Sequence, residues 1–381
     1  MTSGRLGRFT ATLDGLRERS RGRALEPREG HDFASNDYLG LAASPRLRAA
    51  LAGALERGVG VGSGGSRLLR GNDPEHQALE QEAAAFFGAP GCLFFASGFD
   101  ANLALFSTLP RRGDLIVYDT LIHASVHAGM QAGKAACVDG GHNDAQRVED
   151  ALRAWRQAGG KGIPFIAVES IYSMDGDASP LAELVDIAER YDGFLVVDEA
   201  HATGVFGPDG RGLAAPYEGR ESVICVHTCG KALGVSGALV TGHRALLDFL
   251  VNRARPFIYA TSPSPLVAAG VREALRILKD EPERRARLAD LVRVAQGSLR
   301  QRLGVPASGS QIIPVLLHSN ARASAVAARV RAEGFDCRAI RPPTVPEGTA
   351  RLRVSITLNV GPETVMGLVD SIARAMDEVP A

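Results

Sequence analysis

Short apolar runs rich in strand-forming residues alternate with amphipathic helical patterns between about residue 75 and residue 241. Runs that are apolar at nearly every position are typical of strands buried on both faces, and intervening helices let such strands run parallel. The alternation therefore predicts an α/β fold with a mostly parallel sheet covered by helices. The expected strands are Cys92–Ala96, Leu115–Tyr118, Phe165–Glu169, Phe194–Asp198, Val223–His227 and Ala238–Thr241, and the expected helices between them are Glu75–Phe87, Ala101–Leu109, Asp144–Ala158 and Leu181–Tyr191.

The C-terminal third has a different pattern. A long helical stretch over about residues 265–303 leads into a smaller set of elements that predicts a separate α+β unit. These elements are strands at 312–317, 335–340 and 352–356 and helices at 321–333 and 362–376. We therefore expect an N-terminal segment of residues 1–45 that packs with the small domain, a large domain of residues 46–285 and a small domain of residues 286–381.

Charge and cysteine content exclude several classes of protein. The formal net charge is zero and the pI is about 7.1, so no basic surface for nucleic acid or a membrane is expected. No apolar run approaches the roughly 20 residues of a membrane span, and the opening MTSGRLGRFT lacks the apolar core of a signal peptide. Five scattered cysteines suit reduced thiols in the cytoplasm. Cys225 and Cys229 lack a second pair of ligands, so we expect no zinc site.

One lysine has an unusual setting. Only four of the 43 basic residues are lysines, and Lys231 lies in VICVHTCGKALGVSGALV, with no other charged residue between Glu221 and Arg244. A guanidinium stays protonated in proteins, whereas a desolvated amine can lose its proton and act as a nucleophile or base. The setting favours an imine-forming lysine over a surface lysine at a loop edge.

Polar residues follow several predicted strands. Asp198 ends the run Phe194–Asp198, and His201 comes three residues later. Ligands of open α/β sheets collect at the carboxyl ends of strands. A carboxylate there could pair with the pyridinium nitrogen of pyridoxal phosphate, and His201 could donate to its ring hydroxyl. The alternative is an acid that caps a turn and a histidine on a surface loop.

Two further strand ends complete this set. Gly98 and Phe99 lie in a glycine-containing strand-to-helix turn, where free backbone amides and the helix dipole favour a phosphate, and Thr228 offers a hydroxyl nearby. His123 could stack on an aromatic cofactor. Its pairing with His127 at four residues' spacing could also suit a metal, but no acidic residue completes a zinc motif. Many such turns bind nothing, and a plain histidine is the alternative at 123.

The segment Gly60–Gly65 formally matches G-x-G-x-x-G. A dinucleotide fingerprint follows a strand, but the preceding residues 46–57 are helical in pattern, and no acidic residue stands on a second strand about 20 residues on. We interpret the segment as a flexible turn that allows close approach of another backbone, a cofactor or a second subunit.

Seven motifs together resemble the α-oxoamine synthases, which are fold-type I pyridoxal-phosphate enzymes. The resemblance runs from about residue 30 to the C-terminus, and the motifs occur in the family's order. They are SNDYLGL (35–41), GSGGSR (62–67), SGFDAN (97–102), HAS (123–125), YSMDGD (172–177), DEAHATGVFG (198–207) and HTCGKALG (227–234).

The resemblance assigns roles to matching positions, with pyridoxal 5′-phosphate as the cofactor of the large domain. It implies that Lys231 carries the cofactor as an imine, that Asp198 pairs with the ring nitrogen and that His123 stacks on the ring. The remaining implied cofactor contacts are His201 and Ser173 near the ring hydroxyl, Gly98, Phe99 and Thr228 at the phosphate, and Thr261 at the phosphate of the neighbouring subunit. Thr261 thereby implies a homodimer with shared sites.

On the substrate side, Arg353 matches an arginine that binds the amino-acid carboxylate, and Asn36 a second contact. The arginine that meets the acyl donor is Arg23 in our assignment, with Arg17 and Arg21 as alternatives. The family condenses an amino acid with an acyl thioester and releases carbon dioxide and the thiol. The motifs look most like the branch that joins L-alanine to a pimeloyl thioester for biotin biosynthesis.

Several alternatives stay open from the sequence. The thiol carrier is coenzyme A or a carrier protein, and other branches of the family use glycine or serine. TSPSP (261–265) departs from the family's common TSLPP-like run, which bears on the substrate channel. An aminotransferase or decarboxylase of the same fold is the nearest rival class. A non-catalytic partner subunit would lack the imine lysine, which is present here.

Overall fold

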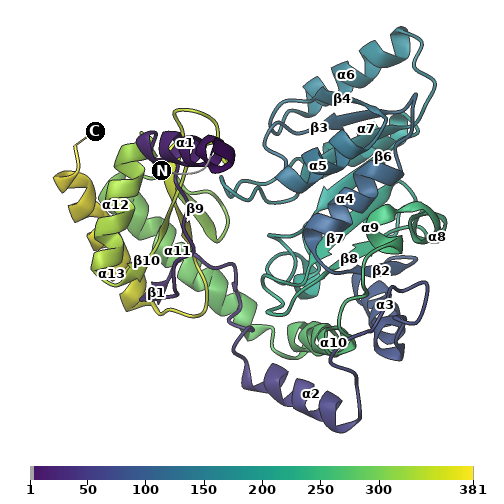
Figure 1. Cartoon of the computed structure of the whole chain (residues 1–381), viewed down its shortest axis with the longest axis horizontal. Helices are drawn as coiled ribbons and strands as arrows, with labels where there is room; N and C mark the ends of the chain where they lie inside the picture. The colour runs from purple at the N-terminus through teal and green to yellow at the C-terminus, as the bar shows by residue number, and fades with distance from the viewer. Residues whose placement is uncertain (1–3, 381) are drawn as a thin grey trace. The chain divides into compact units, whose positions relative to one another are not determined.

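The computed structural model describes residues 4–380. Residues 1–3 and 381, at the outer ends of the predicted N-terminal segment and small domain, lie outside the described residues. Contacts divide the chain into two compact units (Figure 1). The larger unit comprises Leu39–Ser173 and Asp177–Ala286. The smaller unit comprises the N-terminal residues up to Tyr38, the stretch Met174–Gly176 and the residues from Arg287 onward.

The larger unit contains a seven-stranded sheet with the order β2-β8-β7-β6-β5-β3-β4. Only β8 runs antiparallel to its neighbours, so the prediction of a mostly parallel sheet in an α/β fold is confirmed. The strands are β2 (Cys92–Phe95), β3 (Leu115–Tyr118), β4 (Ala136–Asp139), β5 (Pro164–Glu169), β6 (Phe194–Asp198), β7 (Val223–Thr228) and β8 (Ala238–Thr241). The sequence analysis did not predict β4, whose first three residues are exposed at the sheet edge.

Helices cover both faces of this sheet. Alternate residues of each strand point to opposite faces, so each strand contributes side chains to two buried clusters. Phe165 and Ala167 of β5 belong to one buried cluster, and Ile166 and Val168 to the other. The first cluster contains side chains of α4 (Gly98–Thr108), α5 (Ala124–Ala132), α8 (Arg244–Arg253) and α9 (Arg255–Ile258). The second contains side chains of α6 (Ala145–Gln157) and α7 (Leu181–Arg190).

A glycine lets α4 and α5 pack closely. A Cβ added at Gly129 of α5 would lie 2.7 Å from Phe106 Cβ and 2.9 Å from the Asn102 carbonyl oxygen, both on α4. Distances below 3.0 Å require something to shift. Any side chain at position 129 would therefore push the two helices apart.

The remaining helices of this unit are α2 (Pro45–Glu56), α3 (Pro74–Phe87) and α10 (Pro265–Asp280), with a short 3₁₀ turn at Pro208–Gly210. The long helical stretch expected over residues 265–303 is two helices, α10 and α11 (Glu283–Leu303). Pro282 stands at the break, where it ends α10 because it has no backbone N–H for an intrahelical bond.

The smaller unit is an α+β structure. An antiparallel sheet has the order β11-β12-β9, and β1 (His31–Asp32) pairs in parallel with β10 (Phe335–Asp336). The other elements are α1 (Gly4–Glu18), β9 (Ile312–His318), α12 (Asn320–Ala332), β11 (Arg338–Ile340), β12 (Ala350–Ser355) and α13 (Pro362–Glu378). The strand expected at 335–340 is thus two short strands in different sheets. Within residues 4–380, no helix combines the length and apolar character needed to cross a membrane.

Candidate active site

Lys231 lies on a tightly closed turn after β7. The turn is held by a hydrogen bond from the Cys229 backbone N–H to the Gly237 carbonyl oxygen, at 2.9 Å. Gly234 has φ of +68°, and a Cβ there would lie 2.5 Å from the Ala42 backbone nitrogen. The glycines that follow Lys231 are therefore required by the backbone, and they fix where the lysine emerges.

The side chain of Lys231 reaches His201. The Lys231 Nζ is 2.8 Å from His201 Nε2, and His201 is buried just beyond the end of β6. A hydrogen bond between two nitrogens needs one donor and one acceptor, so the two groups cannot both be cationic in this arrangement. The structure thus brings together two residues that the sequence analysis had selected independently.

Asp198, at the carboxyl end of β6, is buried and held by two donors. Its Oδ2 accepts a hydrogen bond from Asn102 Nδ2 at 2.7 Å, and its Oδ1 accepts one from the Ala200 backbone N–H at 3.0 Å. These two hydrogen bonds fix the carboxyl group in position as an acceptor.

The same asparagine links Asp198 to His123. Asn102 Nδ2 also lies 3.0 Å from Ser125 Oγ, and Ser125 Oγ lies 2.8 Å from His123 Nδ1. The sequence analysis quoted Asn102 and Ser125 inside motifs but assigned them no role. The available signal was an amide side chain within the apolar stretch ANLALF, where a polar group needs a buried partner.

His123 precedes α5 and accepts a hydrogen bond from the Ser125 backbone N–H through Nδ1, at 3.2 Å. Desolvation by surrounding atoms lowers the pKa of His123, and the Lys231 charge lowers it further, while Asp198 acts in the opposite direction. The imidazole is therefore neutral at neutral pH. A neutral flat ring suits stacking against an aromatic ligand.

The turn before α4 forms a small cradle. Ser97 caps the helix by accepting a hydrogen bond from the Asp100 backbone N–H. The first amides of a helix have no intrahelical acceptor and favour an anion. A Cβ added at Gly98 would lie 3.0 Å from Thr228 Oγ1, so the absence of a side chain keeps this space open beside the hydroxyl. Phe99 is about half exposed, at 47%.

Glu169 is a buried acid that the sequence analysis did not select. It ends β5 directly beside Asp198 in the sheet register, and its Oε2 accepts a hydrogen bond from the Ser173 backbone N–H at 3.0 Å. Burial and then the neighbouring Asp198 charge raise the pKa of Glu169. A protonated Glu169 removes one of two like charges from adjacent strand ends.

His142 is held between two carboxylates at the same edge of the sheet. Its Nδ1 lies 2.9 Å from Asp119 Oδ1, and its Nε2 lies 2.8 Å from Asp177 Oδ2. Burial lowers the pKa of His142, but the hydrogen bonds and charges of Asp119 and Asp177 outweigh it and raise the pKa to about 10. This imidazolium ties the segment after Tyr172 to the end of β3.

The selected substrate residues lie in the smaller unit. Arg353 on β12 donates from Nη2 to Asn36 Oδ1 at 3.1 Å and from Nη1 to Ser355 Oγ at 2.7 Å. These two hydrogen bonds orient the guanidinium.

The N-terminal arginines of this unit have different partners. Arg17 pairs with Asp14 at 2.8 Å, Arg21 pairs with Glu347, and Arg23 donates to Thr344 Oγ1 at 3.0 Å. Because Arg23 contacts a hydroxyl and the other two contact carboxylates, its charge is the least neutralised by these contacts.

Among residues 4–380, the group of side chains close enough to share a metal is Glu218, Cys225 and His227, and it does not include Cys229. There His227 Nε2 is already hydrogen-bonded to Glu218 at 2.8 Å. His127 packs edge-on against Tyr118.

A model of the family described as aminotransferase class I and II matches residues 28–372. The chain belongs to this family. Among its members, the chain is 40% identical to the 8-amino-7-oxononanoate synthase of Anaeromyxobacter dehalogenans, over all of this chain and 98% of the relative. It is 42% identical to the enzyme of that name from Chromobacterium violaceum, over 92% of this chain and 90% of the relative.

Solved structures agree with the family assignment. A serine palmitoyltransferase from S. paucimobilis, with PLP bound, superposes with a TM-score of 0.89 and 28% identity over 98% of both chains. The 8-amino-7-oxononanoate synthase from Francisella tularensis gives a TM-score of 0.77 at 28% identity, over 91% of this chain and 97% of the other. The resemblance to α-oxoamine synthases and the fold-type I architecture are thereby confirmed.

We expect the thermal stability of the protein to fall at alkaline pH, because His142 loses its proton there. Its folded-state pKa of about 10 exceeds that of an unfolded histidine, about 6.5. Its stabilising contribution is therefore fully present below pH of about 6.5 and is lost as the pH rises through about 10. The thermal unfolding midpoint of the wild type should fall over this range more steeply than that of His142→Gln.

His127→Gln is the control, because burial lowers the pKa of His127 and leaves it neutral over this range. Its midpoint should follow the wild-type curve. Parallel curves for the wild type and His142→Gln would show that the ion pairs with Asp119 and Asp177 do not stabilise the fold.

Proposed function

We propose that this chain is a pyridoxal-phosphate-dependent 8-amino-7-oxononanoate synthase. It would condense L-alanine with a pimeloyl thioester and release 8-amino-7-oxononanoate, carbon dioxide and the free thiol. The main structural support for this chemistry is the contact of 2.8 Å between Lys231 Nζ and His201 Nε2, together with the Asp198 carboxyl group that Asn102 holds in place. Identity of 40% over the full length to enzymes of that name supports this branch over those that use glycine or serine.

The residues present fit the cofactor. The space beside Gly98 and Thr228, next to free helix amides, suits a phosphate. Asp198 is a fixed carboxyl acceptor suited to a protonated ring nitrogen, and the neutral His123 suits the ring face. When bound, pyridoxal phosphate supplies an electron sink for the pair left on the amino-acid Cα.

Lys231 is the proposed proton carrier. Its Nζ would hold the cofactor before the amino acid arrives and would then take the Cα proton as a free amine. His201 Nε2, 2.8 Å from the Lys231 amine, orients this amine. The contact also means that His201 and Lys231 do not both carry a positive charge. The glycines of the Lys231 turn keep the amine at one place through both roles.

Asp198 and its hydrogen-bond partners provide the electrostatic support. A negative carboxylate stabilises a positive ring nitrogen, and Asn102 keeps Oδ2 from rotating away. Ser125 and His123 extend the same chain, so the stacking ring and the carboxylate are oriented together. We propose Ser173 as a contact near the ring hydroxyl, by its place in the YSMDGD motif.

For the substrates, we propose that Arg353 binds the alanine carboxylate with Asn36 beside it and that Arg23 meets the acyl donor. The hydrogen bonds of Arg353 to Asn36 and Ser355 support the first role, because they orient the guanidinium. The contact of Arg23 with a hydroxyl supports the second for the same reason.

We propose a homodimer with shared sites, which is supported by an apolar surface on the larger unit. Val61, Leu69 and Tyr259 are 71%, 86% and 73% exposed. Hydrogen bonds join their two loops, including one from the Ser262 backbone N–H to the Gly65 carbonyl oxygen at 2.9 Å. Exposed apolar surface of this kind marks an interface. The exposed Thr261 lies in the same surface, where it would reach the phosphate of a second copy.

We also propose a cytoplasmic location. The five cysteines lie within the described residues and are all free thiols, which suits a reducing compartment.

Titration of the purified enzyme with amino acids tests the function. We expect a visible absorbance band from lysine-bound pyridoxal phosphate, and L-alanine should change it at lower concentration than glycine or L-serine. Lys231→Ala should lack the native band and lose at least about a thousandfold in turnover with a pimeloyl thioester, because one group carries both nucleophilic and proton-transfer roles.

Lys161→Ala is the matched control, since Lys161 lies in the loop between α6 and β5, and it should keep the band and the activity. A stronger response to glycine would assign the chain to another branch. A wild type without the band after addition of the cofactor would contradict the proposal entirely.

The oligomeric state tests the interface. Leu69→Asp should convert dimer to monomer in sedimentation velocity, because it places a charge in the apolar contact surface. Leu25→Asp, at a fully exposed position of the other unit, should remain dimeric. A monomeric wild type, or a Leu69→Asp dimer as stable as the wild type, would contradict this interface.

A further inference from the structure

A hydrogen-bonded chain of three buried side chains joins the segments that carry His201 and Lys231. Thr203 Oγ1 is 2.8 Å from His227 Nδ1, and His227 Nε2 is 2.8 Å from Glu218 Oε1. Thr203 is 1% exposed, and the side chains of His227 and Glu218 are 0% and 2% exposed. The chain therefore lies inside the larger unit, and the mechanism proposed above does not use it.

The groups of this chain follow the order hydroxyl, imidazole and carboxylate. A carboxylate oxygen accepts hydrogen bonds, so His227 Nε2 carries a proton and donates it to Glu218. In that tautomer Nδ1 accepts a hydrogen bond from the Thr203 hydroxyl. Nucleophilic triads share this order of groups, but a hydroxyl this deeply buried meets no substrate. The chain is therefore suited to orienting the backbone that bears the hydroxyl.

Further contacts fix the imidazole of His227. Its ring stacks on the ring of Phe87, with the centroids 3.7 Å apart, and Thr241 Oγ1 donates to Glu218 Oε1 at 2.5 Å. Phe87 and Thr241 are themselves fully buried. A buried imidazole and carboxylate both lose their hydration, which such partners offset. His227 is thus a rigid anchor for the Thr203 hydroxyl.

The turn that contains Thr203 also carries His201, two residues earlier, and it packs against the Lys231 turn. A Cβ added at Gly204 would lie 2.7 Å from the Cβ of Ala232, so the two turns touch beside the lysine. The contact between Lys231 Nζ and His201 Nε2 is 2.8 Å long. A shift of the Thr203 backbone would therefore move His201 relative to the amine.

We propose that His227, held by Glu218, is a positioning residue that keeps His201 in place against the Lys231 amine. The His227 backbone ends β7 four residues before Lys231, while its side chain anchors the turn of His201. One side chain thus ties together the two segments whose contact orients the amine. The inference rests on the proposed function, in which that amine carries the proton.

A double-mutant cycle in the holoenzyme tests this role. Thr203→Val removes the hydroxyl at nearly constant volume. It should lower kcat with L-alanine and a pimeloyl thioester by about tenfold, the contribution of one hydrogen bond, and leave the KM for alanine unchanged. In a His201→Gln background the same substitution should lower kcat by less than about twofold, because the residue through which it acts is gone. Thr203→Ser keeps the hydroxyl and should recover most of the loss.

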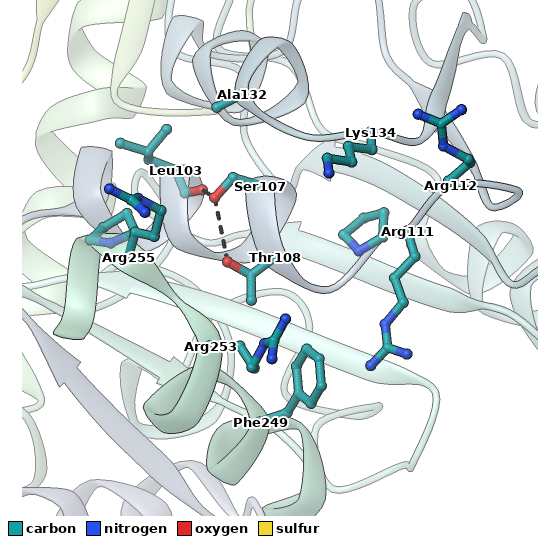
Figure 2. A pocket seen from close by; sticks show the side chains of 12 residues that line it. Leu103, Ser107, Thr108, Arg111, Arg112, Ala132, Lys134, Phe249, Arg253 and Arg255 are labelled. Atoms are coloured by element: carbon teal, nitrogen blue, oxygen red, sulfur yellow. Dashed lines mark hydrogen bonds between the residues drawn. The ribbon is translucent and has the colours of Figure 1, made fainter.

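Thr108→Val is the matched control and should keep the wild-type kcat. Thr108 ends α4 and lines a cavity there, where its Oγ1 lies 3.4 Å from Ser107 Oγ (Figure 2). Equal losses from Thr203→Val with and without His201, or no loss at all, would overturn the proposal. If Thr203→Val does not fold, Glu218→Gln takes its place in the cycle, with the same non-additivity expected.

Crystal structures distinguish a failure of this inference from a failure of the proposed function. Without cofactor, the distance from Lys231 Nζ to His201 Nε2 should exceed about 3.5 Å in Thr203→Val and stay near 2.8 Å in the wild type and in Thr108→Val. An unchanged distance in Thr203→Val would contradict the positioning role. A wild type that binds no pyridoxal phosphate but shows this difference would contradict the proposed function and leave the positioning role standing.

Discussion

The hydrogen bond from Asn102 to Asp198 joins the two structural layers that make the candidate active site. Asp198 belongs to the sheet and Asn102 to α4, so a single amide fixes the register between a strand end and the helix that carries the Gly98 turn. A buried carboxylate without donors would be costly, whereas one with two donors is stable and oriented. Ser125 and His123 continue the hydrogen-bond chain that starts at the same amide.

The neighbouring buried acids show how the sheet edge tolerates so much charge. Glu169 is favoured in its protonated form by burial, and Glu199 is likewise raised in pKa to about 7 by burial, while its oxygens accept hydrogen bonds from Ser170 and the Ala214 backbone N–H. His142 places a positive charge between two further carboxylates. The buried carboxyl groups are thus stabilised in three ways: by protonation, by hydrogen bonds from backbone N–H groups and by ion pairs with an imidazolium.

The larger unit was largely predictable from sequence, because its strands are apolar on both faces and their ends carry the motifs. The six predicted strands match β2, β3 and β5–β8 within one residue at each end. The edge strand β4 was missed because an exposed strand of four residues has no such pattern. The roles of Asn102 and Glu169 were missed because they depend on partners distant in sequence, such as Asp198, 96 residues from Asn102.

The close approach at Gly129 has a consequence for how this chain can vary. Because α5 touches the backbone of α4 at Asn102, a methyl group at position 129 would move the amide that holds Asp198, although position 129 contacts neither cofactor nor substrate. Two substitutions in this helix pair would therefore act on the same contact, and their effects on the site would not be independent of one another.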